Sequence, residues 1–500
     1  MSETREYDLV IVGSGAGGGT VASRLAPLVA QGARIAVLES GPHYHRDYFT
    51  QREIEMMGLL WRGGAWPTAD GAITMATGKG VGGSTMMYTG VTFRLPDDVC
   101  EDWAVPGLTA EDLRPRFDRI EQEISVIEPT PDMVNDNNRL FKEGCDKLGW
   151  DLQVIRLNLK GCQQNGFCNI GCISGGKQGT MEVQIPAAQA GGVEIIPNAH
   201  VKSVGDRQLD VTIGATPKNT HPGPLSPGAY TIKAKRIVLS AGTPGTPALL
   251  LRSGFASQFP TLGKYFTLHP ALTVYGVYPE RIKNYRGFPK TYYSKQFSHT
   301  HDYIMETAFY YPFISTKHLG LWGKELKETM REYNQFMTQI ILNHDDALET
   351  NRIEIDAKGD PVLNYTLSEK SIASLCHAQA SAARIFFAAG CDKVILPCAD
   401  RSIFHKHEVP DAQLESFISP KNFLANKTPI ASAHPQGGCR MGADSTTSVT
   451  NAHGKVHGHD WLYIADASLF PKSSHVNPYL TIMALSERVA EELARTQGKW

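Results

Sequence analysis

The sequence predicts an α/β protein with a Rossmann-like nucleotide-binding domain and a second lobe of the α+β type. In residues 7–41, an apolar run at 8–12 precedes three glycines and a helical pattern. A similar apolar run returns at 235–241. By contrast, residues 265–430 show alternating strands around one helix, 367–389. A mostly parallel sheet with an interleaved antiparallel lobe, itself carrying helices, explains these three observations.

The glycines of the first stretch have the spacing of a dinucleotide-binding loop. Gly13, Gly15 and Gly18 form G-x-G-x-x-G between an apolar strand and a helix. The first glycine allows a sharp turn, the second lets a pyrophosphate approach the backbone, and the third lets helix and strand pack closely. The helix N-terminus presents unpaired N–H groups to the phosphates. Glu39 ends the next apolar strand, where a carboxylate accepts hydrogen bonds from an adenosine ribose.

A second glycine-rich stretch covers residues 76–94. Gly82, Gly83 and Ser84 offer consecutive N–H donors, and a strand rich in Thr, Val and Phe is predicted to follow them. Such a loop suits a backbone that lies against a flat or anionic group, although an ordinary glycine turn has the same composition.

Composition narrows the classes of partner. Among 500 residues, 49 basic and 51 acidic side chains nearly cancel, which argues against nucleic acid as a partner. No run approaches the roughly 20 apolar residues of a transmembrane helix. We therefore expect no transmembrane segment and a cytoplasmic location, while export together with a partner subunit stays open.

The ordered motifs resemble those of the glucose–methanol–choline family of FAD-dependent alcohol oxidoreductases. Beyond the first glycine loop and Glu39, the segments similar to family motifs are 78–85, 235–254, 261–270, 433–442 and 465–490. The resemblance covers nearly the whole chain and implies FAD as the cofactor.

The resemblance assigns a role to individual residues. The implied FAD-binding residues are Gly13, Gly15, Gly18 and Glu39 for the ADP half, Val201 for the adenine, Gly78, Gly83 and Ser84 for the pyrophosphate and flavin, Asp466 and Ala467 for the pyrophosphate and ribityl chain, and Asn477 beside the flavin. Tyr88 departs from the asparagine that many family members carry shortly after the glycine loop. The glycine loop has no histidine suited to covalent attachment, so we expect dissociable FAD.

His434 is the catalytic histidine that the resemblance implies, near flavin N5, with Asn477 as its partner. His475 competes for the partner role because some family members carry histidine in that loop. The Asn-Pro-x-x-Thr form at 477–481 favours Asn477. Histidine and asparagine would hydrogen-bond the alcohol oxygen, direct its C–H bond toward the flavin, and remove the hydroxyl proton.

The same motifs divide the chain into five predicted segments. The FAD-binding domain is expected at 1–99, 181–264 and 431–500, with the catalytic residues in its last part. A helical, cysteine-rich segment on the substrate side is expected at 100–180, and a substrate-binding domain at 265–430. Further helices are predicted at 112–127, 140–148, 180–190 and 479–495.

Several activities fit the family. The main expectation is an alcohol dehydrogenase that passes electrons to a quinone, a cytochrome or another acceptor subunit. An oxidase that uses O₂, acting on long-chain alcohols or sterols, is the first alternative, and a lyase with a structural flavin is an alternative of another class. The sequence does not identify the alcohol. The aromatic run 309–313 suits an apolar substrate or an ordinary core.

Three of the nine cysteines, Cys162, Cys168 and Cys172, lie in one short stretch. Three thiolates in a glycine-bearing loop can ligate iron, whereas zinc would lack a fourth obvious ligand. The spacing resembles the three-iron, four-sulfur site of the multi-subunit glucose dehydrogenase branch. Its second half resembles long-chain alcohol and sterol oxidases equally, for which packed thiols are implied. Both interpretations remain open at this stage.

Overall fold

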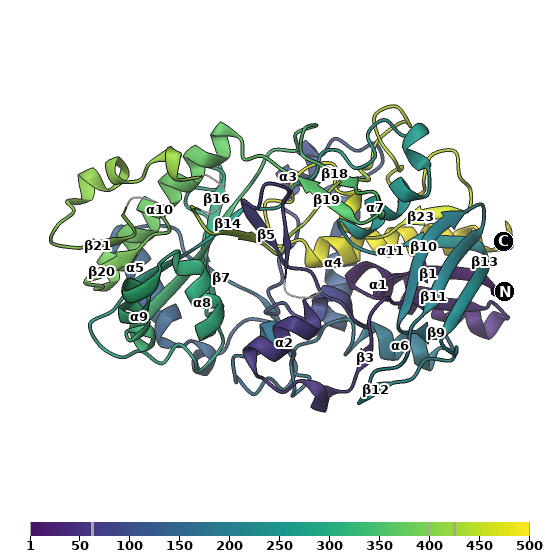
Figure 1. Cartoon of the computed structure of the whole chain (residues 1–500), viewed down its shortest axis with the longest axis horizontal. Coiled ribbons are helices and arrows are strands. Elements are labelled where there is room, and N and C mark those ends of the chain that lie inside the picture. The colour runs from purple at the N-terminus through teal and green to yellow at the C-terminus, as the bar shows by residue number, and fades with distance from the viewer. Residues whose placement is uncertain (1, 62–64, 399–400, 424–426, 500) are drawn as a thin grey trace.

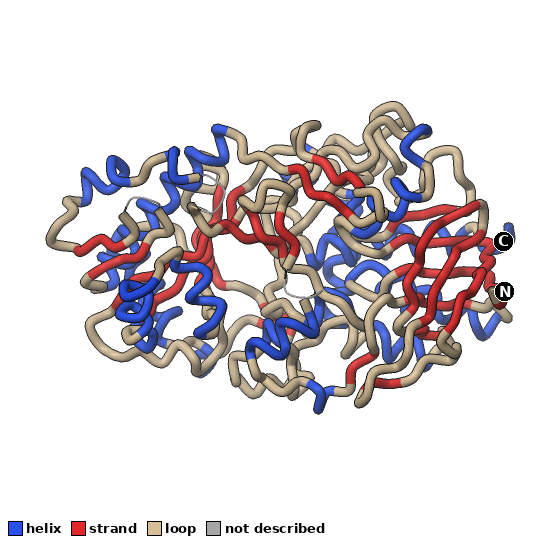
Figure 2. The backbone as a smooth tube through the Cα atoms, in the orientation of Figure 1, coloured by secondary structure: helices blue, strands red, loops and turns tan. Residues whose placement is uncertain are grey.

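The molecule is longer than it is wide, and its two lobes each contain one large sheet (Figures 1 and 2). Both termini lie in the lobe built on β1 (Glu3–Val12) and β13 (Gly228–Leu239). The other lobe is built on β14 (Ala271–Val277) and the long helix α10 (Glu369–Ala389). The computed structural model describes residues 2–61, 65–398, 401–423 and 427–499.

In the described part of the chain, the first lobe has a seven-stranded sheet of order β10-β11-β13-β1-β2-β9, with β23 paired to β13. Strands β1, β2, β9, β13 and β23 are parallel, and β10 and β11 form an antiparallel extension. The strands not yet delimited are β2 (Ile35–Leu38), β9 (Glu194–Ile196), β10 (Ala199–Gly205), β11 (Gln208–Ile213) and β23 (Leu462–Ile464). The predicted Rossmann-like sheet is confirmed.

The apolar run of β1 is explained by burial on both faces of this sheet. Leu9 and Ile11 pack in one hydrophobic cluster, whereas Val10 and Val12 pack in another on the opposite face. Alternating residues of a strand point to opposite faces, so a strand buried twice needs apolar residues throughout.

Helix α1 (Ala16–Leu25) begins at the glycine loop and packs against α6 (Gln184–Ala190) and α11 (Tyr479–Arg495). Close backbone contacts leave no room for side chains at its first turn. A Cβ atom on Gly17 would lie 1.6 Å from the Ala465 carbonyl oxygen. Glycine therefore lets the helix sit directly on the carboxyl ends of the strands.

The second lobe has a largely antiparallel sheet of order β4-β5-β22-β14-β17-β16-β15-β7, with β20 and β21 attached beside β14. One pair, β5 with β22, is parallel. The strands are β4 (Trp66–Pro67), β5 (Ile73–Met75), β7 (Gln153–Val154), β15 (Tyr292–Ser294), β16 (Tyr303–Thr307), β17 (Phe336–Asn343), β20 (Lys393–Ile395), β21 (Ile403–His405) and β22 (Ile430–Ser432).

Helix α10 packs against β14 and β17 together with α5, and it buries one face of this sheet. The other helices are α2 (Glu53–Leu60), α3 (Asp97–Asp102), α4 (Ala110–Glu123), α5 (Asp136–Leu148), α7 (Gly245–Arg252), α8 (Pro312–Leu319) and α9 (Gly323–Met330). The described residues also form three two-stranded ribbons: β3 (His43–Tyr44) with β12 (Thr220–His221), β6 (Val126–Ile127) with β8 (Leu157–Asn158), and β18 (Arg352–Ile355) with β19 (Pro361–Asn364). No helix within the described residues has the length and apolar character needed to cross a membrane.

Two predictions about elements were wrong. The second lobe contains α8 and α9 in addition to α10, and both are short, at about two turns each. The strand predicted after the second glycine loop is absent, and Val91 makes only an isolated bridge to Leu157. Strands β4 and β5 lie within the predicted segment 1–99, yet they pair in the sheet of the second lobe. The boundaries of the five segments stay a prediction.

Candidate active site

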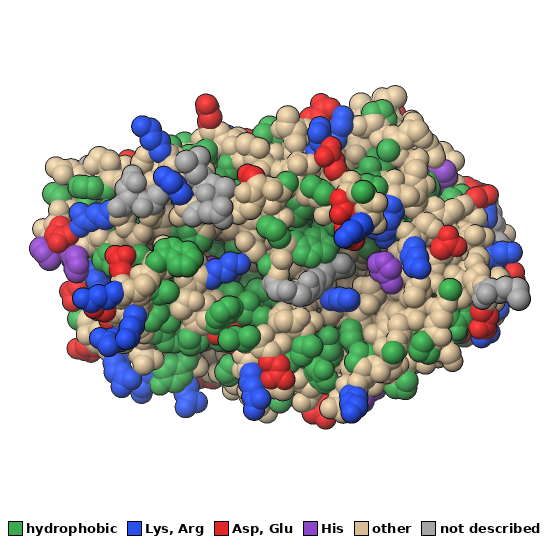
Figure 3. All heavy atoms as spheres, in the orientation of Figure 1, with side chains coloured by type: hydrophobic (Ala, Val, Ile, Leu, Met, Phe, Trp, Pro, Cys, Tyr) green, Lys and Arg blue, Asp and Glu red, His purple; other side chains and the backbone are tan. Residues whose placement is uncertain are grey.

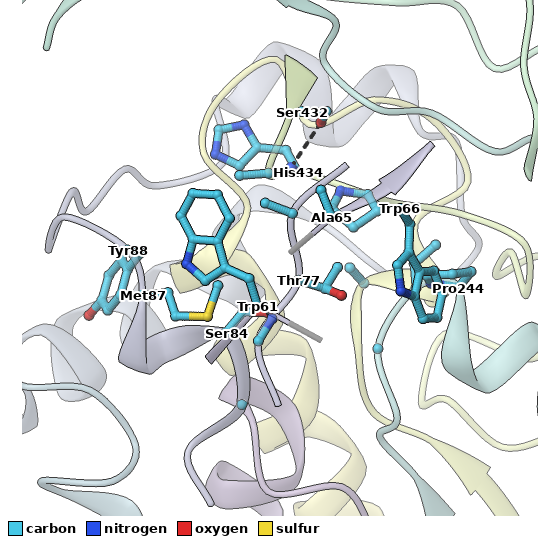
Figure 4. Close-up of a pocket in the computed structure, with 18 of the residues that line it drawn as sticks. Trp61, Ala65, Trp66, Thr77, Ser84, Met87, Tyr88, Pro244, Ser432 and His434 are labelled. Atoms are coloured by element: carbon cyan, nitrogen blue, oxygen red, sulfur yellow. Dashed lines mark hydrogen bonds between the residues drawn. The ribbon is translucent and has the colours of Figure 1, made fainter. Parts of the chain in front are cut away.

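A cavity of about 750 Å³ lies where the two lobes meet. Its walls come from the loop after β1, from residues 76–91, and from side chains of β14 and β17. Figure 3 shows hydrophobic side chains gathered across the middle of the molecule, between the lobes. Figure 4 looks into the cavity. This volume is within the range of cofactor and substrate sites.

The dinucleotide-binding loop forms one end of the cavity. Gly13 has φ of 101°, and a Cβ atom there would lie 2.1 Å from the Ser240 carbonyl oxygen, so only glycine fits. Glu39 is 6% exposed and accepts hydrogen bonds from the Ser14 backbone N–H at 3.1 Å and hydroxyl at 2.7 Å. The Gly41 N–H donates to its second oxygen at 2.9 Å. These contacts fix the carboxylate in the cavity wall.

The two glycine loops touch each other beside the cavity. A Cβ atom on Gly83 would lie 2.7 Å from the Gly15 Cα atom, so these backbones meet without side chains between them. The Gly78 N–H donates to the Ser84 hydroxyl at 2.9 Å, which closes the second loop. Gly15, Gly78, Gly83 and Ser84 line the cavity. Gly18 instead packs against the strand end, where its Cβ atom would lie 2.0 Å from the Gly13 carbonyl oxygen.

Three further predicted residues also line the cavity, namely Val201, Asp466 and Ala467. The Asp466 carboxylate accepts hydrogen bonds from the Gly242 N–H at 2.9 Å and from the Thr246 hydroxyl at 2.6 Å. Burial raises the pKa of this carboxyl group. Asp466 therefore connects the end of β23 to the loop that follows β13.

His434 and Asn477 face the same cavity, whereas His475 does not. In Figure 4 the His434 ring extends into the cavity, and its backbone N–H donates to the Ser432 hydroxyl at 3.1 Å. Asn477 is 8% exposed, and its Oδ1 has no hydrogen-bond partner within the described residues. The His475 ring instead stacks on His344, with centroids 4.4 Å apart. The structure thus places His434 and Asn477 on the wall of one cavity.

His269 is a residue that the sequence analysis missed. Its Nδ1 lies 3.3 Å from the His434 Nδ1, and its Nε2 lies 2.8 Å from the Ser473 hydroxyl. The signal was present in segment 261–270, which carried the family resemblance without a role for this histidine. Because Nδ1 of His434 faces His269, Nε2 is the nitrogen left for a ligand.

His434 is neutral at physiological pH. Desolvation inside the protein, together with a smaller contribution from the positive charge of Lys290, lowers its pKa from 6.5 to about 3. A neutral imidazole with an accessible nitrogen is the form that accepts a proton.

Tyr88 occupies the position that departs from the family pattern. It lines the cavity, and its ring centroid lies 4.7 Å from that of Tyr479. The Asn158 amide donates to its hydroxyl. The tyrosine is therefore held by packing and by a buried hydrogen bond.

The three cysteines of the cysteine-rich segment do not form a metal site. Cys168 is buried, Cys162 and Cys172 are half-buried, and all three thiols are free. Across the described ranges, no three His, Cys, Asp or Glu side chains are grouped so that they could hold a metal ion. Burial also raises the pKa of the Cys168 thiol to about 12. The residues present do not fit an iron–sulfur cluster, and packed thiols explain the segment.

Lys177 holds this segment against the second glycine loop. The side chain is buried, and its ammonium donates to the carbonyl oxygens of Met86, Tyr88 and Cys168 at 2.8, 2.7 and 2.8 Å. All three donors of the ammonium are therefore used. Burial lowers the pKa of Lys177, which reflects the cost of placing a cation there.

Comparison with known proteins identifies the family. The chain matches two GMC oxidoreductase models, the N-terminal model over residues 56–271 and the C-terminal model over residues 347–486. The chain belongs to the GMC oxidoreductase family. It is therefore an oxidoreductase, the resemblance found in the sequence is confirmed, and the family implies FAD.

Individual relatives are similar in sequence to this protein along almost its whole length. A long-chain-alcohol oxidase of Arabidopsis thaliana is 25% identical, over 97% of this chain and 67% of the relative. A 2-methyl-1,2-propanediol dehydrogenase of Mycolicibacterium austroafricanum is 27% identical, over 98% of this chain and 95% of the relative. The crystal structure of pyridoxine 4-oxidase from Mesorbium loti has a TM-score of 0.71 at 17% identity, covering 98% and 99% of the two chains. This last likeness confirms the fold.

The cavity of this GMC oxidoreductase fits FAD. A Cβ atom at Gly13 or Gly78 would collide with neighbouring backbone, so bare backbone forms the wall where a pyrophosphate would approach. The Glu39 carboxylate stands at the end of β2, the position suited to a ribose.

Lys177→Met tests the role of the buried ammonium. The substitution leaves three carbonyl oxygens without their donor, so we expect the free energy of unfolding to fall by about 3 kcal/mol or more. Urea denaturation measures this change. Lys160→Met, at an exposed lysine of the same segment, is the matched control and should change stability by less than about 0.5 kcal/mol. Equal effects of the two substitutions would contradict the role.

Proposed function

We propose that this GMC oxidoreductase uses FAD to oxidise an alcohol to a carbonyl compound, with His434 as the base and Asn477 as its partner. The observation that carries the proposal is the shared cavity, whose wall includes both the neutral imidazole of His434 and the side chain of Asn477. The two relatives named for alcohols support an alcohol as the substrate. Bound FAD supplies the acceptor for the hydride equivalent that leaves the carbon.

His434 and Asn477 have different roles at the alcohol oxygen. His269 beside Nδ1 orients the His434 ring, so that Nε2 accepts the hydroxyl proton as the C–O bond gains double-bond character. The Asn477 amide hydrogen-bonds the same oxygen and fixes its position. In this proposal His475 has no direct role, because its ring stacks on His344 outside the cavity.

The remaining cavity residues would hold FAD. The proposed binding residues are Gly13, Gly15, Glu39, Gly78, Gly83, Ser84, Val201, Asp466, Ala467 and Asn477. Gly18 contributes indirectly, because it allows the close packing that positions the first loop.

The electrons then pass to a separate carrier, such as a quinone or a cytochrome. The names of the two relatives point to different acceptors, since one is an oxidase and the other a dehydrogenase. The proposal follows the dehydrogenase, which matches this chain over 95% of its own length.

His434→Ala tests the base. The variant should keep its FAD and reduce it with alcohol about 10²- to 10⁴-fold more slowly, which is the usual contribution of a positioned base. Anaerobic stopped-flow absorbance measures flavin reduction, and the ratio of flavin to protein absorbance measures binding. His475→Ala is the matched control and should stay within about threefold of the wild type, because a threefold change is below 1 kcal/mol. A wild-type rate in His434→Ala would remove His434 from the proposed role.

The pH dependence tests the protonation state of His434. A pKa lowered to about 3 keeps the ring neutral in the free enzyme, so kcat/KM should not fall through loss of this base between about pH 8 and pH 5. Anaerobic stopped-flow absorbance measures the second-order rate constant for flavin reduction across this pH range. A tenfold fall per pH unit, beginning near pH 6.5 as for an ordinary histidine, would contradict the lowered pKa.

The electron acceptor is tested by the fate of the reduced enzyme. If a carrier is the physiological acceptor, air should reoxidise the alcohol-reduced enzyme at least about tenfold more slowly than a soluble quinone does, a difference of 1.4 kcal/mol in barrier. Hydrogen peroxide formed in step with the carbonyl product would show an oxidase. Carbonyl formation without any flavin reduction would show a lyase.

A further inference from the structure

The cavity opens to solvent beside α8 and the start of α9. Lys317, Gly320 and Trp322 line the cavity and are also exposed, which is possible only where the cavity wall reaches the molecular surface. Ile314 and His318 on the same helix line the cavity from buried positions. Helix α8 therefore contributes both to the inner wall of the cavity and to the rim of its opening.

A large apolar side chain faces water at this opening. Trp322, the N-cap residue of α9, is 86% exposed, more than any other large hydrophobic side chain in the described part of the chain. Tryptophan is usually well buried because its indole ring is large. A ring with an apolar body and one N–H group suits the boundary between water and lipid.

Two further exposed apolar side chains lie where α2 meets α8. The Glu53 carboxylate of α2 accepts hydrogen bonds from the backbone N–H groups of Phe313 at 2.9 Å and Ile314 at 2.8 Å. Phe313 is 48% exposed, and Ile54, which follows Glu53, is 67% exposed. Helix α2 reaches the cavity through Met57. Exposed apolar side chains that gather at one opening mark an interaction site, whereas single ones do not.

Two lysines at the opening have no acidic partner. Lys317 and Lys427 line the cavity, are exposed, and make no ion pair within the described residues. Lys427 comes from a distant part of the sequence, but its segment adjoins the end of α8. A Cβ atom on Gly320 would lie 3.3 Å from Cδ of Pro429. Positive charge therefore accompanies the apolar side chains.

The other charges next to the opening are compensated. Helix α9 carries two lysines and two glutamates, which cancel. Arg52 lies 3.9 Å from Glu55. The Glu53 carboxylate faces the N-terminus of α8, where the helix dipole is positive. Lys317 and Lys427 are thus the positive charges that a partner can use.

An anionic lipid bilayer fits this combination of side chains. Its headgroups attract lysines at the surface, and apolar side chains enter the boundary between headgroups and acyl chains. A second copy of this chain fits less well, because a twofold interface joins the same surface of both copies and would bring their uncompensated lysines together.

We propose that this surface binds the protein to an anionic lipid bilayer, with the opening of the cavity toward the lipid. The rim surface consists of Ile54, Phe313, Lys317, Trp322 and Lys427. Bound in this way, the protein removes the Trp322 ring from water, and apolar molecules dissolved in the bilayer can enter the cavity directly. Such peripheral binding needs no helix that crosses the membrane.

Cosedimentation with vesicles tests the binding of the full-length, FAD-loaded protein. Vesicles of dioleoyl phosphatidylcholine are compared with vesicles of equal parts of this lipid and dioleoyl phosphatidylglycerol, at about 0.1 M salt. The anionic vesicles should bind the wild type about 25-fold more tightly, because each lysine near such a surface contributes about fivefold. Raising the salt to about 0.5 M should reduce this difference, since ions screen exposed charges.

Substitutions of aromatic residues test the apolar part of the rim surface. Trp322→Ala and Phe313→Ala should each weaken binding to the anionic vesicles, the first by about tenfold or more, because burial of a large apolar side chain contributes at least this factor. Phe417→Ala is the matched control. Phe417 is 39% exposed but contacts Phe404 on β21 and does not line the cavity, so its loss should leave vesicle binding unchanged.

Substitutions of lysines test the charged part. Lys317→Gln combined with Lys427→Gln should bring the affinity for anionic vesicles close to that for neutral vesicles. Lys202→Gln combined with Lys233→Gln removes the same charge from exposed positions on the first sheet and is the matched control. This control should keep the wild-type preference for anionic vesicles.

Three outcomes would overturn the proposal. The first is a wild type that binds anionic vesicles no more tightly than neutral ones. The second is Trp322→Ala that binds as tightly as Phe417→Ala. The third is a dimer in sedimentation velocity that Trp322→Ala dissociates, without vesicle binding, which would assign the rim surface to a second copy. None of these measurements uses an alcohol, so their results stand apart from the test of alcohol oxidation.

Discussion

Contact between backbones at the carboxyl ends of the parallel strands is the constraint on which the site depends. Gly13 meets Ser240 after β13, and Gly17 meets Ala465 at the end of β23, at distances that exclude any Cβ atom. Three strands can therefore end side by side. The crevice beyond them receives Glu39 from the end of β2 and Asp466 from the end of β23, the strands on either side of the β1–β13 pair. A side chain at either glycine would force the strand ends apart and open the wall of the cavity.

The second lobe contributes a part of the cavity wall that is separate from the glycine loops. One face of its sheet is buried against α10, and the other forms the floor of the cavity. Thr273, Ile340 and Lys290 line the cavity but take no part in the hydrogen bonds of the glycine loops. Under the proposed function, changes at these three residues alter substrate binding and leave the wall formed by the glycine loops the same.

Local patterns made the first lobe predictable from the sequence. The bounds of α11 agree with those predicted, and the second apolar strand is present as β2 directly before Glu39. A doubly buried strand and an amphipathic helix are each complete in one short stretch. The contact of His269 with His434 and the pairing of Lys290 with Glu306 could not be predicted, since each joins segments whose proximity depends on the whole fold. The cysteine spacing allowed two interpretations, and only the position of Lys177 showed that a cation and carbonyl oxygens hold that segment.

The first sheet also takes its strands from three distant parts of the chain, and this affects how the protein is made. β23 pairs with β13 across more than two hundred residues, and α11 then packs on α1. Nearly the entire polypeptide must therefore be synthesised before β23 can pair with β13. Until then, the edge of β13 that β23 covers in the folded protein has no partner strand.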